Sequence, residues 1–161
     1  MNNPKRYTLI LLCIALVGCS TLDKAPQRED ATTELSQVEL RVHYLINQYR
    51  IARNLPSLAT NRIITREART HSREMAERTI TFSHDGFRKR IKRISRSLPY
   101  RSAAENVAYN RGYPDCAQEA VERWLKSSHH RKNIRGPYML TGIGVAKDPH
   151  GGYYFTQIFW R

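Results

Sequence analysis

The segment Tyr153–Trp160 carries large apolar side chains on both of its faces. It is rich in β-forming residues, and successive side chains of a strand point to opposite sides of a sheet. Its alternate positions give two apolar sets: Tyr153, Phe155 and Phe159 on one face, and Tyr154, Ile158 and Trp160 on the other. A strand that is apolar on both faces must be covered on both, and helices packed above and below the sheet provide that cover. The segment therefore predicts a sheet between two helical layers.

The rest of the chain supplies a second strand and the helices. Gly142–Ala146 is too short and Gly-rich for a helix, and the turn signal Asp148–Gly152 joins it to the last strand as an antiparallel hairpin. Apolar residues recur at helical spacing within 35–49, 64–75 and 115–125, the last stretch opening with Asp115 as a predicted N-cap. The expected fold class is α/β, a three-layer α-β-α sandwich with a mainly antiparallel central sheet.

The first twenty residues have the pattern of an export signal. Lys5 and Arg6 precede an apolar run, Leu9–Val17, that is far shorter than the roughly 20 residues needed to span a bilayer. The run ends at Leu16-Val17-Gly18-Cys19, which resembles a bacterial lipobox, with an ordinary signal peptide that happens to contain Cys as the alternative. The resemblance implies that Cys19 becomes the first mature residue and carries diacylglycerol and an N-linked acyl chain such as palmitate.

These signals divide the chain into three parts. We expect a lipoprotein signal peptide in residues 1–18, the lipidated Cys19 with a flexible tether in residues 19–34, and one domain in residues 35–161. The protein is then exported and lipid-anchored to the cell envelope, and in a Gram-negative cell to the outer membrane, periplasmic or surface-exposed. With Cys19 taken by lipid, Cys116 has no partner for a disulfide and is expected to be a small core residue.

A strong positive charge limits the partners that such an exported protein can have. The chain has 27 basic and 14 acidic residues, a formal net charge of +13, and loss of Lys5 and Arg6 with the signal peptide leaves it strongly basic. Outside the cytoplasm, nucleic acid is disfavoured as a partner. Anionic lipid, lipopolysaccharide and wall polymers are the polyanions that remain.

Much of this charge gathers between Gly86 and Arg101, a segment without acidic residues. Ile91, Ile94 and Leu98 fall at helical spacing there, which predicts an amphipathic helix with a cationic face. The residues predicted to bind an anionic surface are Arg88, Lys89, Arg90, Lys92, Arg93 and Arg96. The alternatives are a solvated face that only keeps the protein soluble, and nucleic-acid binding, which the export signal disfavours.

Several short motifs occur in an order that resembles one known family. They are Ile46-Asn47-Gln48-Tyr49-Arg50 with Leu55-Pro56-Ser57-Leu58, Phe82-Ser83-His84, Ala104-Glu105-Asn106-Val107-Ala108, Trp124 and Ser127 with His130-Arg131-Lys132-Asn133-Ile134, and the closing strands Gly142-Ile143-Gly144-Val145 and Tyr154-Phe155-Thr156-Gln157-Ile158-Phe159-Trp160. Together they resemble the bacterial branch of the CAP superfamily, also called SCP-like extracellular domains, from about Leu35 to the end. The resemblance implies an α/β/α sandwich with a central cleft.

The resemblance also implies candidate site residues. Eukaryotic members hold two His and two Glu in the cleft, where they can bind a divalent cation such as zinc. Here His84 matches the first His and Glu105 matches one Glu, whereas Ser127 and Tyr154 stand at the other two positions. His130 is the remaining candidate from this branch, and His84, Glu105 and His130 would be an adequate His₂Glu metal set.

Two other interpretations of these three residues stay open. The first is a buried hydrogen-bonded cluster in which Glu105 orients the imidazoles and helps to fix the fold. The second is catalysis by a divalent-cation-dependent, protease-like hydrolase through His84, Glu105 and His130. His71 lies on an apolar helical stripe and is expected to be a core histidine instead.

The sequence therefore supports two functions. The favoured one is a non-catalytic, lipid-anchored binding module for an envelope component such as acidic lipid, wall polymer or a protein partner, with no required cofactor and at most weak binding of zinc or another divalent cation. The alternative is the hydrolase.

Overall fold

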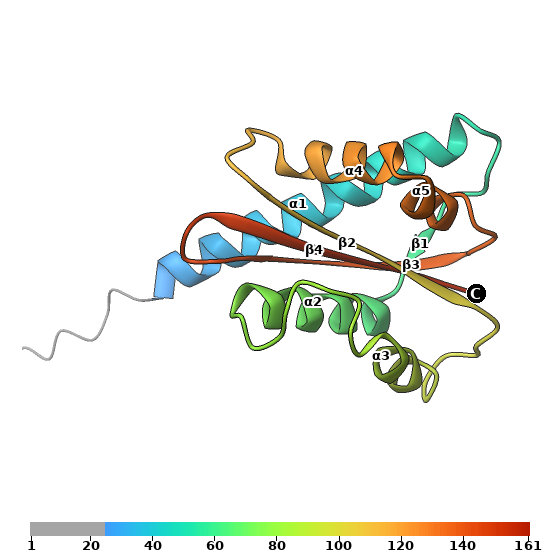
Figure 1. The fold of residues 1–161 in the computed structure, drawn as a ribbon, viewed down its shortest axis with the longest axis horizontal. Helices are drawn as coiled ribbons and strands as arrows, with labels where there is room; N and C mark the ends of the chain where they lie inside the picture. The colour runs from blue at the N-terminus through green and yellow to red at the C-terminus, as the bar shows by residue number, and fades with distance from the viewer. Residues whose placement is uncertain (1–24) are drawn as a thin grey trace, which may run out of the picture.

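The structure, a computed structural model, describes residues 25–161 of the chain (Figure 1). Its elements run in the order α1 (Ala25–Ile51), β1 (Ala59–Thr60), α2 (Arg62–Ala76), α3 (Phe87–Ile94), β2 (Ala103–Arg111), α4 (Cys116–Lys126), α5 (Ser128–Ile134), β3 (Leu140–Lys147) and β4 (Gly152–Trp160).

The described strands form a single mixed sheet with the order β1-β3-β4-β2. β4 pairs antiparallel with β3 on one side and β2 on the other, and the two-residue β1 adds a parallel edge to β3. Helices α1, α4 and α5 cover one face of the sheet and α2 and α3 cover the other (Figure 1). Phe155–Trp160 is buried throughout. The three-layer α/β/α sandwich and the C-terminal hairpin predicted from the sequence are thus confirmed.

Each face of the sheet packs its own apolar cluster. The larger cluster joins Val42 and Ile46 of α1 with Trp124 of α4 and Phe155 and Phe159 of β4. The smaller one joins the inner sides of α2 and α3 to Ile158 and Trp160. Every residue of the two clusters and of their packed neighbours lies between positions 35 and 160, so a chain from residue 19 onward keeps the whole described core.

Two glycines let α2 lie directly on the sheet. A Cβ atom on Gly144 would lie 2.1 Å from the Arg69 backbone nitrogen, and one on Gly142 would lie 2.2 Å from that of Thr65. The Gly-rich character of β3 therefore comes from close approach of a helix to a strand. Asn61 caps α2, because its side chain accepts hydrogen bonds from the backbone N–H groups of Ile63 and Ile64.

Helix α1 starts at Ala25, within the stretch up to residue 34 that the sequence predicts to be a flexible tether. Pro26 is compatible with this helix, because the first turn tolerates proline, whose missing N–H has no intrahelical partner there. Glu34 is also fixed by the domain, since its carboxylate accepts hydrogen bonds from Lys147 and Tyr153. Residues 25–34 are thus helical, and the tether prediction is wrong for them.

The export signal, Cys19 and the rest of the tether lie outside the described residues and stay predictions. Among residues 25–161, no helix is both long enough and apolar enough to cross a membrane. Cys116 has a free, buried thiol that belongs to the larger apolar cluster, which confirms it as a core residue.

Candidate functional site

Glu105 of β2 lies at the centre of a buried polar cluster between the sheet and α3. It is only 4% exposed. Its neighbour Asn106 faces the opposite layer, where its amide donates to the backbone carbonyl of His130 at 3.2 Å. The alternation of side chains along β2 therefore sends Glu105 and Asn106 into different halves of the sandwich.

Arg90 of α3 is the main partner of Glu105. Its Nε donates to Oε2 at 2.8 Å and its Nη2 to Oε1 at 2.7 Å, a bidentate pair with both side chains buried. Its Nη1 also donates to the backbone carbonyl of Asp85 at 2.8 Å. The prediction that Arg90 belongs to the cationic surface is wrong: the residue is 3% exposed and points inward, because a buried carboxylate needs a paired cation.

His84 lies in the loop between α2 and α3. Its Nδ1 is 3.0 Å from Glu105 Oε1, and its side chain is 46% exposed. Burial alone would raise the pKa of Glu105, but the hydrogen bonds from His84 and Arg90 outweigh burial and hold that pKa below its usual value. Glu105 is therefore an ionised, fully paired carboxylate at neutral pH.

His71 of α2 packs behind this cluster and is fully buried, which confirms it as a core histidine. Its Nδ1 is 3.1 Å from Thr156 Oγ1 and 3.9 Å from Glu105 Oε2. Burial, reinforced by the charge of Arg90, lowers the pKa of His71 to about 4, so the ring is neutral at pH 7. Sequence reasoning did not connect His71 with Glu105, because only the packing of α2 on the sheet brings them together.

His130 of α5 does not join Glu105. Its half-buried ring instead stacks edge-on against His129, with 5.8 Å between ring centroids. Burial and the charges of His129 and His84 lower its pKa. No group of three or more His, Cys, Asp or Glu within the described part of the chain is placed to hold a metal ion. Since both oxygens of Glu105 are already hydrogen-bonded to Arg90, the residues present do not fit the His84–Glu105–His130 cation set.

A pocket of about 470 Å³ lies beside the cluster, and His130 forms part of its wall. Three aromatic rings dominate it: Tyr154 lies 4.8 Å from Tyr109 and 6.4 Å from Phe82 between centroids. Ser127 and Tyr154, the two positions that depart from the family pattern, both line this pocket. Sequence reasoning missed the aromatic wall, because the contact between Tyr109 and Tyr154 depends on the register of β2 against β4.

The exposed side of α3 and the turn that follows it carry the other cations predicted to bind an anionic surface. Arg93 is partly neutralised, since its Nε lies 2.7 Å from Glu67 of α2. We define the α3 basic face as the four exposed cations Arg88, Lys89, Lys92 and Arg96. Within the described chain, none of these four forms an ion pair with a carboxylate. Their charge is directed to solvent.

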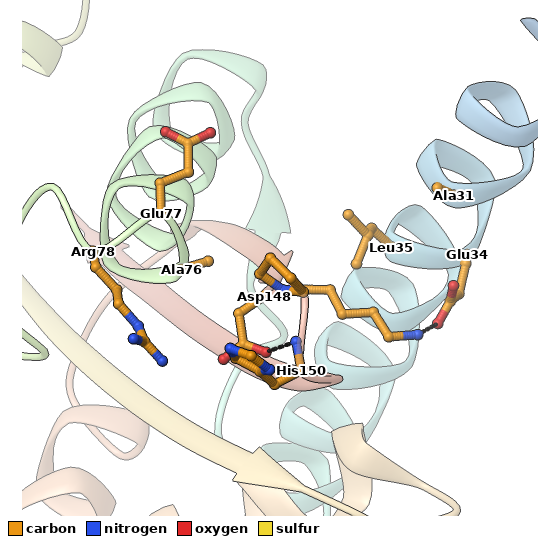
Figure 2. A pocket seen from close by; sticks show the side chains of 10 residues that line it. Ala31, Glu34, Leu35, Ala76, Glu77, Arg78, Asp148 and His150 are labelled. Carbon is orange, nitrogen blue, oxygen red and sulfur yellow. Dashed lines mark hydrogen bonds and ion pairs between the residues drawn. The ribbon is translucent and has the colours of Figure 1, made fainter. Parts of the chain in front are cut away.

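A larger cavity, about 690 Å³, lies between the first part of α1, the end of α2 and the β3–β4 turn (Figure 2). Three of its polar side chains have partners in the described chain. Lys147 pairs with Glu34 across one wall, and the Asp148 carboxylate accepts from the backbone N–H groups of His150 and Gly152, both at 2.8 Å. The predicted turn at Asp148–Gly152 is present, and we assign no ligand to this cavity.

Comparisons with known proteins give relatives of one kind. A family model described as CAP, cysteine-rich secretory protein family, matches residues 43–159. Two proteins of Bacillus subtilis (strain 168) are similar in sequence. "Uncharacterized protein YkwD" is 28% identical over 145 residues, covering 88% of this chain and 54% of that protein. "Uncharacterized membrane protein YlbC" is 32% identical over 127 residues, covering 75% of this chain and 34% of that protein. The chain thus spans about half of the first relative and a third of the second.

Solved structures of related fold are also similar to this chain. An extracellular protein containing a SCP domain from Bacillus anthracis superposes with a TM-score of 0.71 at 27% identity, over 83% of this chain and 43% of that one. An outer surface protein from Borrelia burgdorferi superposes with a TM-score of 0.66 at 20% identity, over 78% of this chain and 92% of that one. The second likeness concerns the fold alone.

Proposed function

The chain belongs to the CAP family of cysteine-rich secretory proteins. From this membership we propose that it is a non-catalytic binding module of the bacterial cell envelope. Its α3 basic face binds an anionic component of that envelope. The observation that carries the proposal is the set of four exposed cations on one short segment, none of them paired with a described carboxylate. The proposal includes the export signal and the lipid on Cys19 predicted from the sequence. The extracellular relative from Bacillus anthracis supports an exported location.

The chemistry of the face suits a dense array of phosphate groups. A basic residue close to an anionic membrane surface contributes about 1 kcal/mol of binding free energy. Lys89 and Lys92 stand three residues apart and Arg88 and Lys92 four apart, so these side chains share one side of the helix. Acidic lipid headgroups, lipopolysaccharide and wall polymers all present the anionic groups that such a face would bind.

The Glu105 cluster supports binding rather than hydrolysis. A hydrolase built on His84, Glu105 and His130 would need a general base or a metal-activated water within reach of substrate. Glu105 instead accepts two hydrogen bonds from a buried guanidinium, and His130 lines the neighbouring aromatic pocket. The cluster has the form of a buried structural pair that anchors α3, and with it the basic face, to the sheet.

The test compares two variants of equal net charge. In residues 19–161 with Cys19→Ser, one variant replaces the α3 basic face by Gln at positions 88, 89, 92 and 96. The matched control replaces the exposed cations Arg111, Lys126, Lys132 and Arg135 by Gln. Each is titrated with vesicles containing phosphatidylglycerol, with lipopolysaccharide and with a phosphate-bearing wall polymer.

We expect the α3 variant to bind at least one of these ligands about 10² times more weakly than the wild type, with the control much less affected. Equal losses in the two variants would mean that only net charge matters and would refute a defined binding face. The three ligands distinguish the sources of the anionic group.

A further inference from the structure

An apolar groove of about 430 Å³ opens at the end of the sheet where β3 begins and β4 ends. Leu98, Met139, Leu140 and Trp160 supply its apolar lining. Trp160 is fixed in place, because its indole Nε1 donates to the Pro99 carbonyl at 2.8 Å. The end of the sheet thus forms one wall of the groove, and the loop that follows α3 forms the other and is held to the sheet by this hydrogen bond.

Two large side chains at this groove are unusually accessible. Met139 is 68% exposed, and Tyr100, whose ring lies 5.0 Å from that of Trp160, is 52% exposed. Single exposed apolar residues are ordinary on protein surfaces, but a cluster around an apolar groove marks a site of interaction. A tyrosine at the edge of such a patch is typical of a membrane interface, where its ring contacts lipid and its hydroxyl stays in water.

Cations border the same groove. Arg101 and Arg161 line it, and Arg96 lies in the segment that connects α3 to it. These three arginines form no ion pair with the carboxylates of the described chain. The groove also adjoins the α3 basic face, because Leu98 packs on the same apolar cluster as Ile91 and Ile94 of that helix.

We propose that this groove docks on a lipid bilayer that contains acidic lipids, with Met139 and Tyr100 entering the boundary between headgroups and acyl chains and the arginines contacting lipid phosphates. Apolar groups ringed by cations match the two layers of such a surface, whereas a soluble anionic polymer offers nothing for the apolar groups to bind. The inference rests on the proposed function and narrows its anionic component to membrane lipid.

The experiment measures flotation of the chain from residue 19, with Cys19→Ser, on phosphatidylcholine vesicles with and without phosphatidylglycerol. Binding is measured at low salt and at about 1 M salt, where the Debye length of about 3 Å removes most of the attraction between surface charges. The variants are Met139→Ser and Met139→Trp. The control is Leu40→Ser on α1, a comparably exposed apolar residue far from the groove.

We expect the wild type to require phosphatidylglycerol and to keep part of its binding at high salt. Met139→Ser should weaken vesicle binding about tenfold and abolish the salt-resistant part, whereas Met139→Trp should strengthen it and Leu40→Ser should leave it unchanged. Binding of the wall polymer should be the same in all four proteins.

Other results separate the two proposals. If Met139→Ser binds acidic vesicles as the wild type does, or if the wild type ignores them and binds only the polymer, the groove is not a membrane site, while the α3 basic face stands. If the α3 variant of the preceding section binds every ligand normally, the proposed function itself fails.

Discussion

Arg90 donates two hydrogen bonds to the two carboxylate oxygens of Glu105, and both side chains are buried between α3 and the sheet. Arg90 thus takes up the carboxylate oxygens with which, by the family resemblance, Glu105 would bind a metal cation. It also fixes the inner side of the helix whose outer side carries the α3 basic face. Most of the following predictions depend on this arrangement.

Removing Arg90 should be among the most destabilising single changes near the cleft. Arg90→Met leaves the Glu105 carboxylate buried without its cation, and breaking such a pair lowers the free energy of unfolding by about 3–5 kcal/mol. The control Arg88→Met, on the exposed side of the same helix, should stay within about 0.5 kcal/mol of the wild type. Urea unfolding followed by circular dichroism measures both, and similar midpoints for the two variants would contradict a structural role for the pair.

The stability of the protein should fall on mild acidification because of His71. Its pKa is lowered to about 4 in the folded chain, mainly by burial and then by Arg90 and His84, with Glu105 opposing them, against 6.5 for the unperturbed group. Between these values the unfolded chain binds the extra proton, so the free energy of unfolding decreases by about 3 kcal/mol as the pH falls through this window. In His71→Gln, the decrease over the same window should be smaller by about that amount. Parallel stability curves for the two proteins would show that His71 does not titrate in this way.

We expect that His84 and Glu105 do not form a zinc-binding site. Isothermal titration of zinc into residues 19–161 with Cys19→Ser should give the same affinity for the parent and for His84→Ala, because the oxygens of Glu105 are held by Arg90 and His84. His84 is half exposed, so its removal should leave the fold intact. Micromolar binding that disappears in His84→Ala would mean that Arg90 gives way to a metal ion, and the hydrolase alternative would have to be considered again.

Gly144→Ala should disturb the packing of α2 on β3. The added methyl group would lie 2.1 Å from the Arg69 backbone nitrogen, and a helix backbone cannot yield as a flexible side chain does. We expect a loss of about 1–3 kcal/mol in unfolding free energy, as for other overpacked interiors. Ser72→Ala, which removes a hydroxyl from the same contact without adding volume, serves as a comparison. A neutral Gly144→Ala would show that α2 can move away from the sheet at little cost.

The layers of the fold could be predicted because their signals are local. The double-sided Tyr153–Trp160 strand, the helical stripes and the Asp115 cap are patterns within short segments, and each appears in the structure. The pattern puts the start of the first helix at Leu35 because residues 25–34 have few apolar residues, although nothing in that stretch prevents a helix.

The site was predictable only in part, since its contacts join distant segments. His84 and Glu105 do come together, as the family resemblance implied, but His130 does not join them. The run of basic residues hides the inward position of Arg90, although Arg90 stands three residues after Phe87 and four before Ile94, on the apolar side of the helix. A buried Glu105 needs a cationic partner, and this requirement is the signal that points to a basic residue directed inward.

The early start of α1 bears on how the protein would sit on a membrane. From a lipid on Cys19, as the sequence predicts, to Ala25 the chain can reach at most about 20 Å, at about 3.5 Å per residue. Helix α1 begins at one end of the long axis of the sandwich, and the groove lies near the other end, beside the C-terminus (Figure 1). A molecule held at one end by so short a connection to the lipid and docked at the other end would lie with its long axis along the membrane. The α2–α3 layer would then face the lipid, and the α1–α4–α5 layer would face away from it. The α1–α4–α5 layer would then be free to contact other molecules of the envelope.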